Sequence, residues 1–247
     1  MKNRLFILAH PDDEIFCLPF LLEKDYRNFF VYLTSGKMPS QSIKIIKIRQ
    51  CEIEKSFKLM RSEAVMEQIL LKNTTQDSVL YREISGDLIQ ELLDCILRND
   101  ISECCTMKFE GGHQDHDITN VLTRLFCQKL QIGFREFAMY SASEKKILNF
   151  KINMDSVQGE ILKFNRIKVA LLAMRMMKIY GSQWRTWIGL SLPLIQSYIF
   201  STWRDGFANP NEPIKNPRYA LYEIRGKATV AQIKESIESL HFMFEDI

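Results

Sequence analysis

The sequence has few of the features that mark disulfide-rich, membrane-spanning or repetitive proteins. Its cysteines are scattered through apolar segments with no C-x-x-C spacing, which favours reduced core residues over disulfides or metal ligands. The apolar stretch at residues 187–200 is too short, and too interrupted by Pro193 and polar residues, for a bilayer span. No internal repeat or low-complexity segment is visible. We therefore expect an ordinary globular chain, with reduced thiols at Cys17, Cys51, Cys95, Cys104, Cys105 and Cys127.

The sequence also has no strong excess of positive or negative charge. Lys and Arg number 33 against 30 Asp and Glu, and a net charge of +3 is too small to favour a nucleic-acid partner. Basic residues recur along the helix expected at 40–61. They could form a solvated helix face, or they could recognise an anionic substrate such as a nucleotide sugar. The N-terminus has no signal peptide pattern, because its apolar stretch is short and is broken by His10 and acids. We expect a cytoplasmic protein.

Histidine is scarce, yet three of the four histidines lie in two short acidic clusters. The first cluster is His-Pro-Asp-Asp-Glu at residues 10–14, and the second is His-Gln-Asp-His-Asp at residues 113–117. Imidazole and carboxylate are ligands that Zn²⁺ takes, and two His plus one Asp leave positions open for water and substrate. Together the clusters predict a catalytic metal site.

Each cluster follows an expected strand, at residues 4–9 and 101–107. Ligands of open α/β sheets bind in the crevice beyond the carboxyl ends of the strands, where both clusters would lie. His113 and His116 are three residues apart, so on a helical turn both imidazoles face the same ion or substrate atom. Taken alone, either cluster could be a helix cap or a hydrogen-bonded histidine pair, and the shared context favours the metal site.

The remaining pattern predicts an α/β fold with a Rossmann-like parallel sheet. A length of 247 residues and a hydrophobic content of 46% fit one domain with appended elements, or at most two domains. Residues 1–150 should form the core. Strands are expected near 4–9, 28–34, 64–71, 101–107 and 134–140, and helices near 14–24, 40–61, 85–99 and 117–131.

Residues 151–247 should form a mostly helical part that packs on this core. The expected elements are a methionine-rich helix at 157–178, a loop at 208–217, a last strand at 219–224 and a helix at 230–244. The apolar stretch at 187–200 is interpreted as a buried helix or a lid over the mouth of the site. A membrane-facing surface is the alternative.

The strings at residues 9–14 and 112–116 resemble the two signature motifs of the PIG-L/LmbE-like N-acetylglucosaminyl de-N-acetylases. Members of that family take part in glycolipid-anchor, mycothiol and bacillithiol synthesis. Order, spacing and strand context agree, although Gln114 stands where the family usually has proline, and weaker similarity extends through residues 49–52 and 180–183. The resemblance implies a zinc-dependent hydrolase of linear amides.

The resemblance also implies roles for residues of both clusters. His10, Asp13 and His116 match the family's metal ligands. Asp12 matches the general base, which would take a proton as a metal-bound water attacks the amide carbonyl. The metal would be Zn²⁺, with Fe²⁺ as the alternative, because the donor set accommodates both.

Expulsion of the amine calls for a cation or a proton donor near the metal. His113 fits that task, with Asp115 holding its imidazolium and raising its pKa. Some relatives have a tyrosine where this chain has Gly111, and Tyr140 or Tyr180 could take its place from another element.

Two further residues are candidates for sugar recognition. Arg49 matches an arginine that contacts substrate in relatives, although a surface charge on a helix is the alternative. Asp87 could bind sugar hydroxyls by analogy, although it also fits an ordinary helix cap.

We predict a metal-dependent hydrolase that removes the acetyl group from an N-acetylated amino sugar in a glycoconjugate or in a nucleotide- or lipid-linked precursor. One alternative is an amidase with the same mechanism that acts on another amide, such as a thiol conjugate. The other is a metal- or glycan-binding protein without turnover. The sequence leaves open the carrier of the sugar, peripheral membrane contact and formation of a homo-oligomer.

Overall fold

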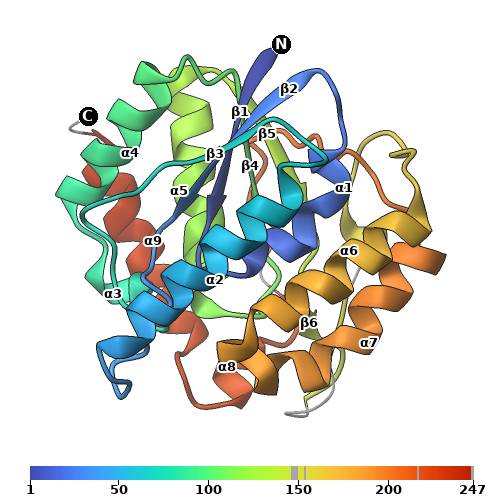
Figure 1. The fold of residues 1–247 in the computed structure, drawn as a ribbon. Coiled ribbons are helices and arrows are strands. Elements are labelled where there is room, and N and C mark those ends of the chain that lie inside the picture. Colours follow the sequence, from blue (N-terminus) through green and yellow to red (C-terminus); the bar gives the residue numbers. More distant parts are fainter. Residues whose placement is uncertain (146–149, 153, 216, 246–247) are drawn as a thin grey trace.

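The computed structural model describes residues 1–145, 150–152, 154–215 and 217–245. Its central element is a five-stranded sheet in which all neighbouring strands are parallel, and this confirms the expected α/β class (Figure 1). The order across the sheet is β3-β2-β1-β4-β5. The strands are β1 (Lys2–Leu8), β2 (Tyr26–Tyr32), β3 (Met66–Gln68), β4 (Glu103–Met107) and β5 (Gly133–Phe137).

The order of the strands creates a crevice between β1 and β4. The chain adds β2 and β3 on one side of β1, and then returns to add β4 and β5 on the other side. The connections that leave β1 and β4 therefore diverge at the carboxyl end of the sheet. Open parallel sheets bind their ligands at such a switch point.

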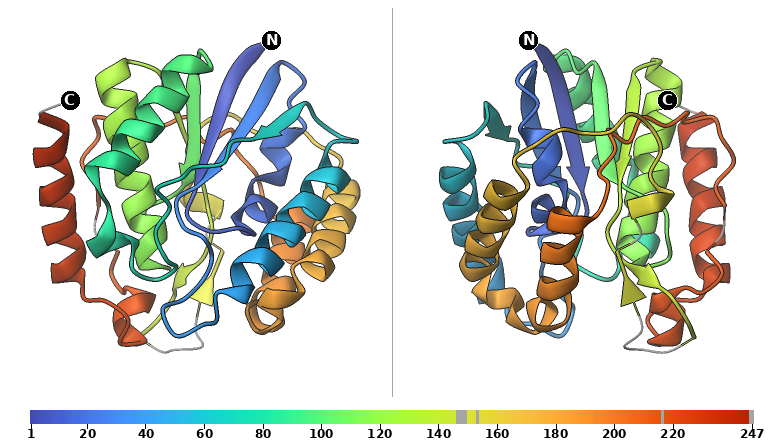
Figure 2. Two further views of the ribbon diagram at one scale, coloured as in Figure 1. Left: turned by 60° about the vertical axis from the view of Figure 1, so that its left-hand side comes forward. Right: turned by 90° about the vertical axis from the view of Figure 1, so that its right-hand side faces the viewer.

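Helices cover both faces of the sheet (Figure 2). One face carries the 3-10 helix η1 (Asp13–Cys17), α1 (Leu18–Leu21), α2 (Lys44–Met60), α6 (Arg166–Ile179) and α7 (Trp184–Phe200). The other face carries α3 (Leu80–Glu83), α4 (Gly86–Arg98), α5 (Gln114–Leu130) and α9 (Val230–Glu245). The smaller elements are β6 (Ser141–Ala142), β7 (Phe150–Lys151), η2 (Met154–Ser156), η3 (Gly181–Gln183) and α8 (Leu221–Ile224).

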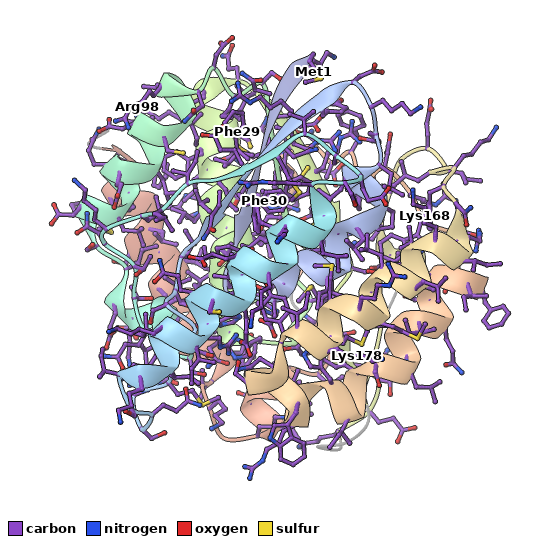
Figure 3. The ribbon with its side chains drawn as sticks, in the orientation of Figure 1. Met1, Phe29, Phe30, Arg98, Lys168 and Lys178 are labelled. Atoms are coloured by element: carbon purple, nitrogen blue, oxygen red, sulfur yellow. The ribbon has the colours of Figure 1, made fainter. Side chains whose placement is uncertain are left out.

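Consecutive residues of the central strands supply two separate hydrophobic cores. Phe30 packs on the α2 side, where its ring stacks on Phe6 at a centroid distance of 4.8 Å. Phe29, labelled beside it in Figure 3, belongs to the core beneath α4 and α5. Successive side chains of a strand point to opposite faces, so a strand covered on both faces must be apolar at nearly every position. This requirement explains why residues 4–9 read as a continuous apolar run.

Several expected elements differ from the structure. The strand expected at 219–224 is not found, because residues Leu221–Ile224 form the short helix α8, in which Ile224 N–H and Arg225 N–H donate to the carbonyls of Ala220 and Leu221. The helix expected at 14–24 is divided into η1 and α1, with Pro19 in the first turn of α1. The long helix expected from 157 begins only at α6, where the Asn165 side chain caps it.

The cysteines are all unpaired, and five of them are buried as expected. Cys51 is the exception, because it lies on the exposed side of α2. Among the described residues, none of the helices has both the length and the apolar character needed to cross a bilayer.

Candidate functional site

The two histidine clusters meet in one cavity of about 380 Å³ at the carboxyl end of the sheet. His10 follows β1, and His113 and His116 lie at the start of α5, which follows β4. Because β1 and β4 are neighbours in the sheet, residues more than 100 positions apart lie side by side at the switch point.

Three residues in this cavity have donor atoms spaced as ligands of one metal ion would be. His116 Nε2 lies 3.2 Å from His10 Nδ1 and 3.2 Å from Asp13 Oδ1. Asp13 Oδ2 lies 3.6 Å from His10 Nδ1. Ligand atoms held about 2.0–2.2 Å from a tetrahedral ion are roughly 3.3–3.6 Å apart. The residues His10, Asp13 and His116 therefore fit a divalent metal in both chemistry and spacing.

Further donors lie on both sides of the His10 ring, with Asp77 and Asp115 at its Nε2 atom. His10 forms one compact group with His113 and His116 and another with Asp77 and Asp115, in each of which the donor atoms lie within 4.8 Å of one another. His10 belongs to both groups. Mixed imidazole and carboxylate donors are typical of zinc and non-haem iron sites.

The side chain of Asp115 contacts His10, whereas the sequence predicted that it would hold His113. Its Oδ2 atom lies 3.1 Å from His10 Nε2 and accepts a hydrogen bond from Ser78 N–H, and its Oδ1 atom accepts one from Leu80 N–H. A carboxylate at Nε2 holds the proton on that nitrogen and leaves Nδ1, which faces Asp13 and His116, free to bind an ion.

The surroundings of His113 favour its neutral imidazole form. This residue is the N-terminal cap of α5, and its Nδ1 accepts a hydrogen bond from Asp115 N–H. Burial and the nearby charge of His10 lower the pKa of His113 to about 4, so the expected rise in its pKa is not found. The Nε2 atom lies 4.0 Å from Asp77 Oδ1 and carries the proton of the neutral ring.

Asp12 lies beside the three donors in a strained backbone conformation. Its φ of 113° is in a region that non-glycine residues rarely adopt, and Ser78, across the site, has a φ of 71°. Burial raises the pKa of Asp12 well above its usual range, although the charge of Arg49 opposes this rise. By contrast, His116 and His10 outweigh burial and hold the pKa of Asp13 well below its usual range.

Arg49 lines the cavity and also holds the loop that follows β1. Its Nη1 donates to the carbonyl of Pro11 at 2.6 Å and lies 3.4 Å from Asp12 Oδ1. The guanidinium is buried beneath Gly36, where an added Cβ would lie 3.1 Å from the Arg49 side chain. Asp87 is not brought to this cavity, because it is exposed in the first turn of α4.

Asp77 and Trp187 also line the cavity, and neither was expected there from the sequence. Asp77 is an isolated acid in a loop after β3, and Trp187 belongs to α7, so neither carries a local signal. Tyr140 also lines the cavity, with its ring 5.7 Å from that of His116. Tyr180 instead donates its hydroxyl proton to the buried Glu14 and does not reach the cavity lining.

Comparison with solved structures shows where else this fold occurs. A triple mutant of a deacetylase of the teicoplanin biosynthetic pathway is 14% identical, with a TM-score of 0.59 over 83% of this chain and 94% of that one. The N,N'-diacetylchitobiose deacetylase from Pyrococcus horikoshii is 16% identical, with a TM-score of 0.56 over 84% and 83%. The zinc-inhibited form of teicoplanin deacetylase is 13% identical, with a TM-score of 0.52 over 74% and 85%. These likenesses establish the fold.

The family was identified from the sequence itself. A search among curated proteins found no match. The model of the family described as PIG-L, GlcNAc-PI de-N-acetylase, matches residues 5–127, which run from β1 into α5 and include both histidine clusters. On this match the chain belongs to the PIG-L family, and its fold is the one that the solved deacetylases share.

Proposed function

We propose that this protein is a metal-dependent hydrolase that removes the acetyl group from an N-acetylated amino sugar. The observation that carries the proposal is the close approach of His10, Asp13 and His116, whose donor atoms lie 3.2–3.6 Å apart in pairs beside the carboxylate of Asp12. A cluster of His and Asp that served only the stability of the fold would have no need of an additional acid, here Asp12, that faces a cavity.

His10, Asp13 and His116 would hold the metal. When bound there, a divalent ion lowers the pKa of a water ligand and polarises the amide carbonyl of the substrate. Zn²⁺ and Fe²⁺ both suit these donors. Because a neighbouring structure is described as a zinc-inhibited form, excess zinc and stoichiometric zinc are to be tested separately.

Asp12 would move the proton. Its burial favours the protonated form, which brings the carboxylate closer to the neutral range where a general base works best. Asp12 takes a proton from the attacking water and then delivers it to the amide nitrogen as the C–N bond breaks. One water is consumed, and acetate and the free amine are released.

His113 and Arg49 would assist in different ways. The Nε2–H of neutral His113 donates a hydrogen bond to the carbonyl oxygen as that oxygen gains negative charge. Arg49 positions Asp12 and the Pro11 carbonyl and lines the wall against which the sugar would lie. Asp115 keeps the His10 ring oriented.

The cavity favours a polar ligand of about the size of a sugar residue. Its volume of about 380 Å³ is at the lower end of the range for small-molecule sites. Three lining residues each carry a buried polar atom with no partner among the described protein atoms: Arg49 Nε, Gln114 Oε1 and Trp187 Nε1. Buried polar atoms without partners are rare, and their occurrence on three lining residues favours a polar ligand over an apolar one.

The six unpaired cysteines support a reducing compartment, and we place the reaction in the cytoplasm on that ground.

The proposal is tested by measuring acetate release from N-acetylglucosamine, UDP-N-acetylglucosamine and a lipid-linked N-acetylhexosamine. The protein is stripped of metal and reconstituted with Zn²⁺ or Fe²⁺. We expect release from at least one substrate, and Asp12→Asn should lower the rate by about 10²–10⁴-fold because the proton carrier is lost. Asp87→Asn, outside the cavity, is the matched control and should keep the rate.

Two outcomes contradict the proposal. If thiol conjugates with an amide bond are hydrolysed and the sugars are not, the enzyme is an amidase of another class. If metal-loaded protein releases no acetate from any of these compounds, the site binds without turnover.

A further inference from the structure

The segment from residue 161 to residue 204 has a charge pattern unlike that of the rest of the chain. It contains no Asp or Glu, whereas the remaining residues hold 26 basic residues against 30 acidic ones. This segment includes both α6 and α7. Its cations are Lys163, Arg166, Lys168, Arg175, Lys178, Arg185 and Arg204.

The same segment exposes large apolar side chains at helical spacing. On α7, Ile188 is 72% exposed and Leu192 is 65% exposed, and on α6 Ile167 is 69% exposed. Residues four apart lie on one face of a helix. The outer face of the α6–α7 hairpin, called the hairpin face below, is made by Ile167, Leu171, Met174, Trp184, Ile188 and Leu192, all of them exposed.

The hairpin face lies on the outside of the molecule and is rigidly attached to it. Figures 1 and 2 show α6 and α7 side by side at the surface, with α2 next to α6, and Figure 3 marks Lys168 and Lys178 toward the two ends of α6. Glu52 of α2 accepts hydrogen bonds from Ser182 N–H and Oγ–H, in the turn between the two helices. This anchor fixes the orientation of the hairpin on the core.

Several cations around the hairpin face have no acidic partner. Lys168 pairs with Glu63, and Arg166 donates to the carbonyls of Ile199 and Ser201. In the described parts of the chain, no carboxylate forms an ion pair with Arg175, Lys178 or Arg185, all of which are exposed. An apolar stripe bordered by unpaired Lys and Arg is the composition of helices that lie in a membrane interface.

We infer that the hairpin face docks on the surface of an anionic lipid bilayer. The exposed aliphatic and Trp184 side chains would enter the headgroup region, and Arg175, Lys178 and Arg185 would pair with lipid phosphates. Self-association through this face is disfavoured, because a second copy would bring like charges together.

The hairpin face and the catalytic cavity share one helix, α7. Arg185 and Gly189 of α7 line the cavity, and Ile188 lies between them in the sequence and points outward. The helix that contacts lipid thus also forms one wall of the site. The inference does not depend on the proposed function, since its test requires no turnover.

The test is flotation of the full-length protein with vesicles of phosphatidylcholine alone or of phosphatidylcholine mixed with phosphatidylglycerol. We expect binding to the anionic vesicles that weakens as salt is added. Trp187 and Trp203 are buried, so a blue shift of tryptophan fluorescence on binding would report Trp184.

Paired variants distinguish vesicle binding through the hairpin face from nonspecific adsorption of the protein. Ile188→Asp with Leu192→Asp, and separately Arg175→Glu with Lys178→Glu, should each lower vesicle binding by about tenfold or more. Leu97→Asp and Arg98→Glu, on the exposed side of α4, are the matched controls and should change it less than about twofold.

Circular dichroism melting of each variant excludes unfolding as the cause of lost binding. The inference is overturned if the wild-type protein does not bind anionic vesicles, or if the α4 controls lose binding equally. It is also overturned if sedimentation shows a dimer that Ile188→Asp dissociates, because the apolar stripe would then be a contact between copies.

Discussion

Glu14 holds together the loop that carries the metal donors, although its own side chain does not line the cavity. Its carboxylate accepts hydrogen bonds from Asp12 N–H at 3.1 Å, from Tyr32 Oη–H at 3.0 Å and from Ser56 Oγ–H at 2.8 Å, and also from the Tyr180 hydroxyl. These donors come from the β1 loop, β2, α2 and the end of α6. A buried carboxyl group with every oxygen satisfied fixes a strained loop without exposing charge.

Gly112 is a residue of the site at which a single methyl group should be strongly damaging. A Cβ at this position would lie 1.8 Å from the backbone oxygen of Tyr140, which cannot rotate away. We expect Gly112→Ala to lower the free energy of unfolding by about 3 kcal/mol or more and to displace His113. Urea denaturation measures the loss.

Gly86→Ala is the control for that substitution, because no atom lies within 4 Å of a Cβ there. It opens α4 and should be neutral or stabilising by up to about 1 kcal/mol. Equal losses from both variants would show that close packing at Gly112 is not the cause.

A buried ion network fastens the strands at the end of the sheet opposite to the cavity. Arg4 of β1 donates to Glu103 of β4 at 2.7 Å and also pairs with Glu23. Arg135 of β5 lies 2.9 Å from the other oxygen of Glu103, and its Nη1 donates to Glu23. Two guanidinium groups thus share two carboxylates across three strands. Because little water reaches these charges, each one is stabilised mainly by the opposite charges of the network.

Neutralising Glu103 should therefore weaken the whole sheet. We expect Glu103→Gln to lower the free energy of unfolding by about 3–5 kcal/mol, since it leaves buried guanidinium charge uncompensated. The exposed pair of Arg27 and Glu67, also on neighbouring strands, is the comparison, and Glu67→Gln should cost less than about 1 kcal/mol. Chemical denaturation of both variants checks the difference, and a small loss for Glu103→Gln would contradict the network's role.

For the whole molecule, the sheet order makes one site from two distant sequence clusters. β1 and β4 become neighbours only because the chain reverses direction across the sheet after β3. A metal held by His10 and His116 would therefore connect the two halves of the core. Binding to the folded state alone couples such an ion to global stability.

Metal binding should accordingly raise the melting temperature. At a free Zn²⁺ concentration about 100 times Kd, we expect a gain of about 2.7 kcal/mol, or roughly 5–10 °C for a chain of this size. His116→Ala should abolish the gain. His241 is the one histidine outside the clusters and is exposed on α9, so His241→Ala should retain the gain in melting temperature. A metal-induced shift that survives His116→Ala would place the ion elsewhere.

The sequence by itself determined the parallel α/β class, because strands that are apolar on both faces leave continuous runs such as residues 4–9 and 101–107. It also determined which histidines and acids gather, since both clusters directly follow strands whose carboxyl ends meet at one edge. The helix at 230–244 could be predicted for a similar reason, as its apolar periodicity is local. Each of these signals depends on residues close in the chain.

Only the tertiary structure decided the roles that depend on distant neighbours. Asp77 enters the site from an irregular loop, Asp115 turns to His10 instead of His113, and Asp87 remains outside at the start of α4. Residues 219–224 have an apolar pattern that suits a strand or a helix, and backbone hydrogen bonds within the folded segment form α8. Local sequence fixes the period and burial of an element, whereas the strand order and the contacts between elements fix which side chains meet.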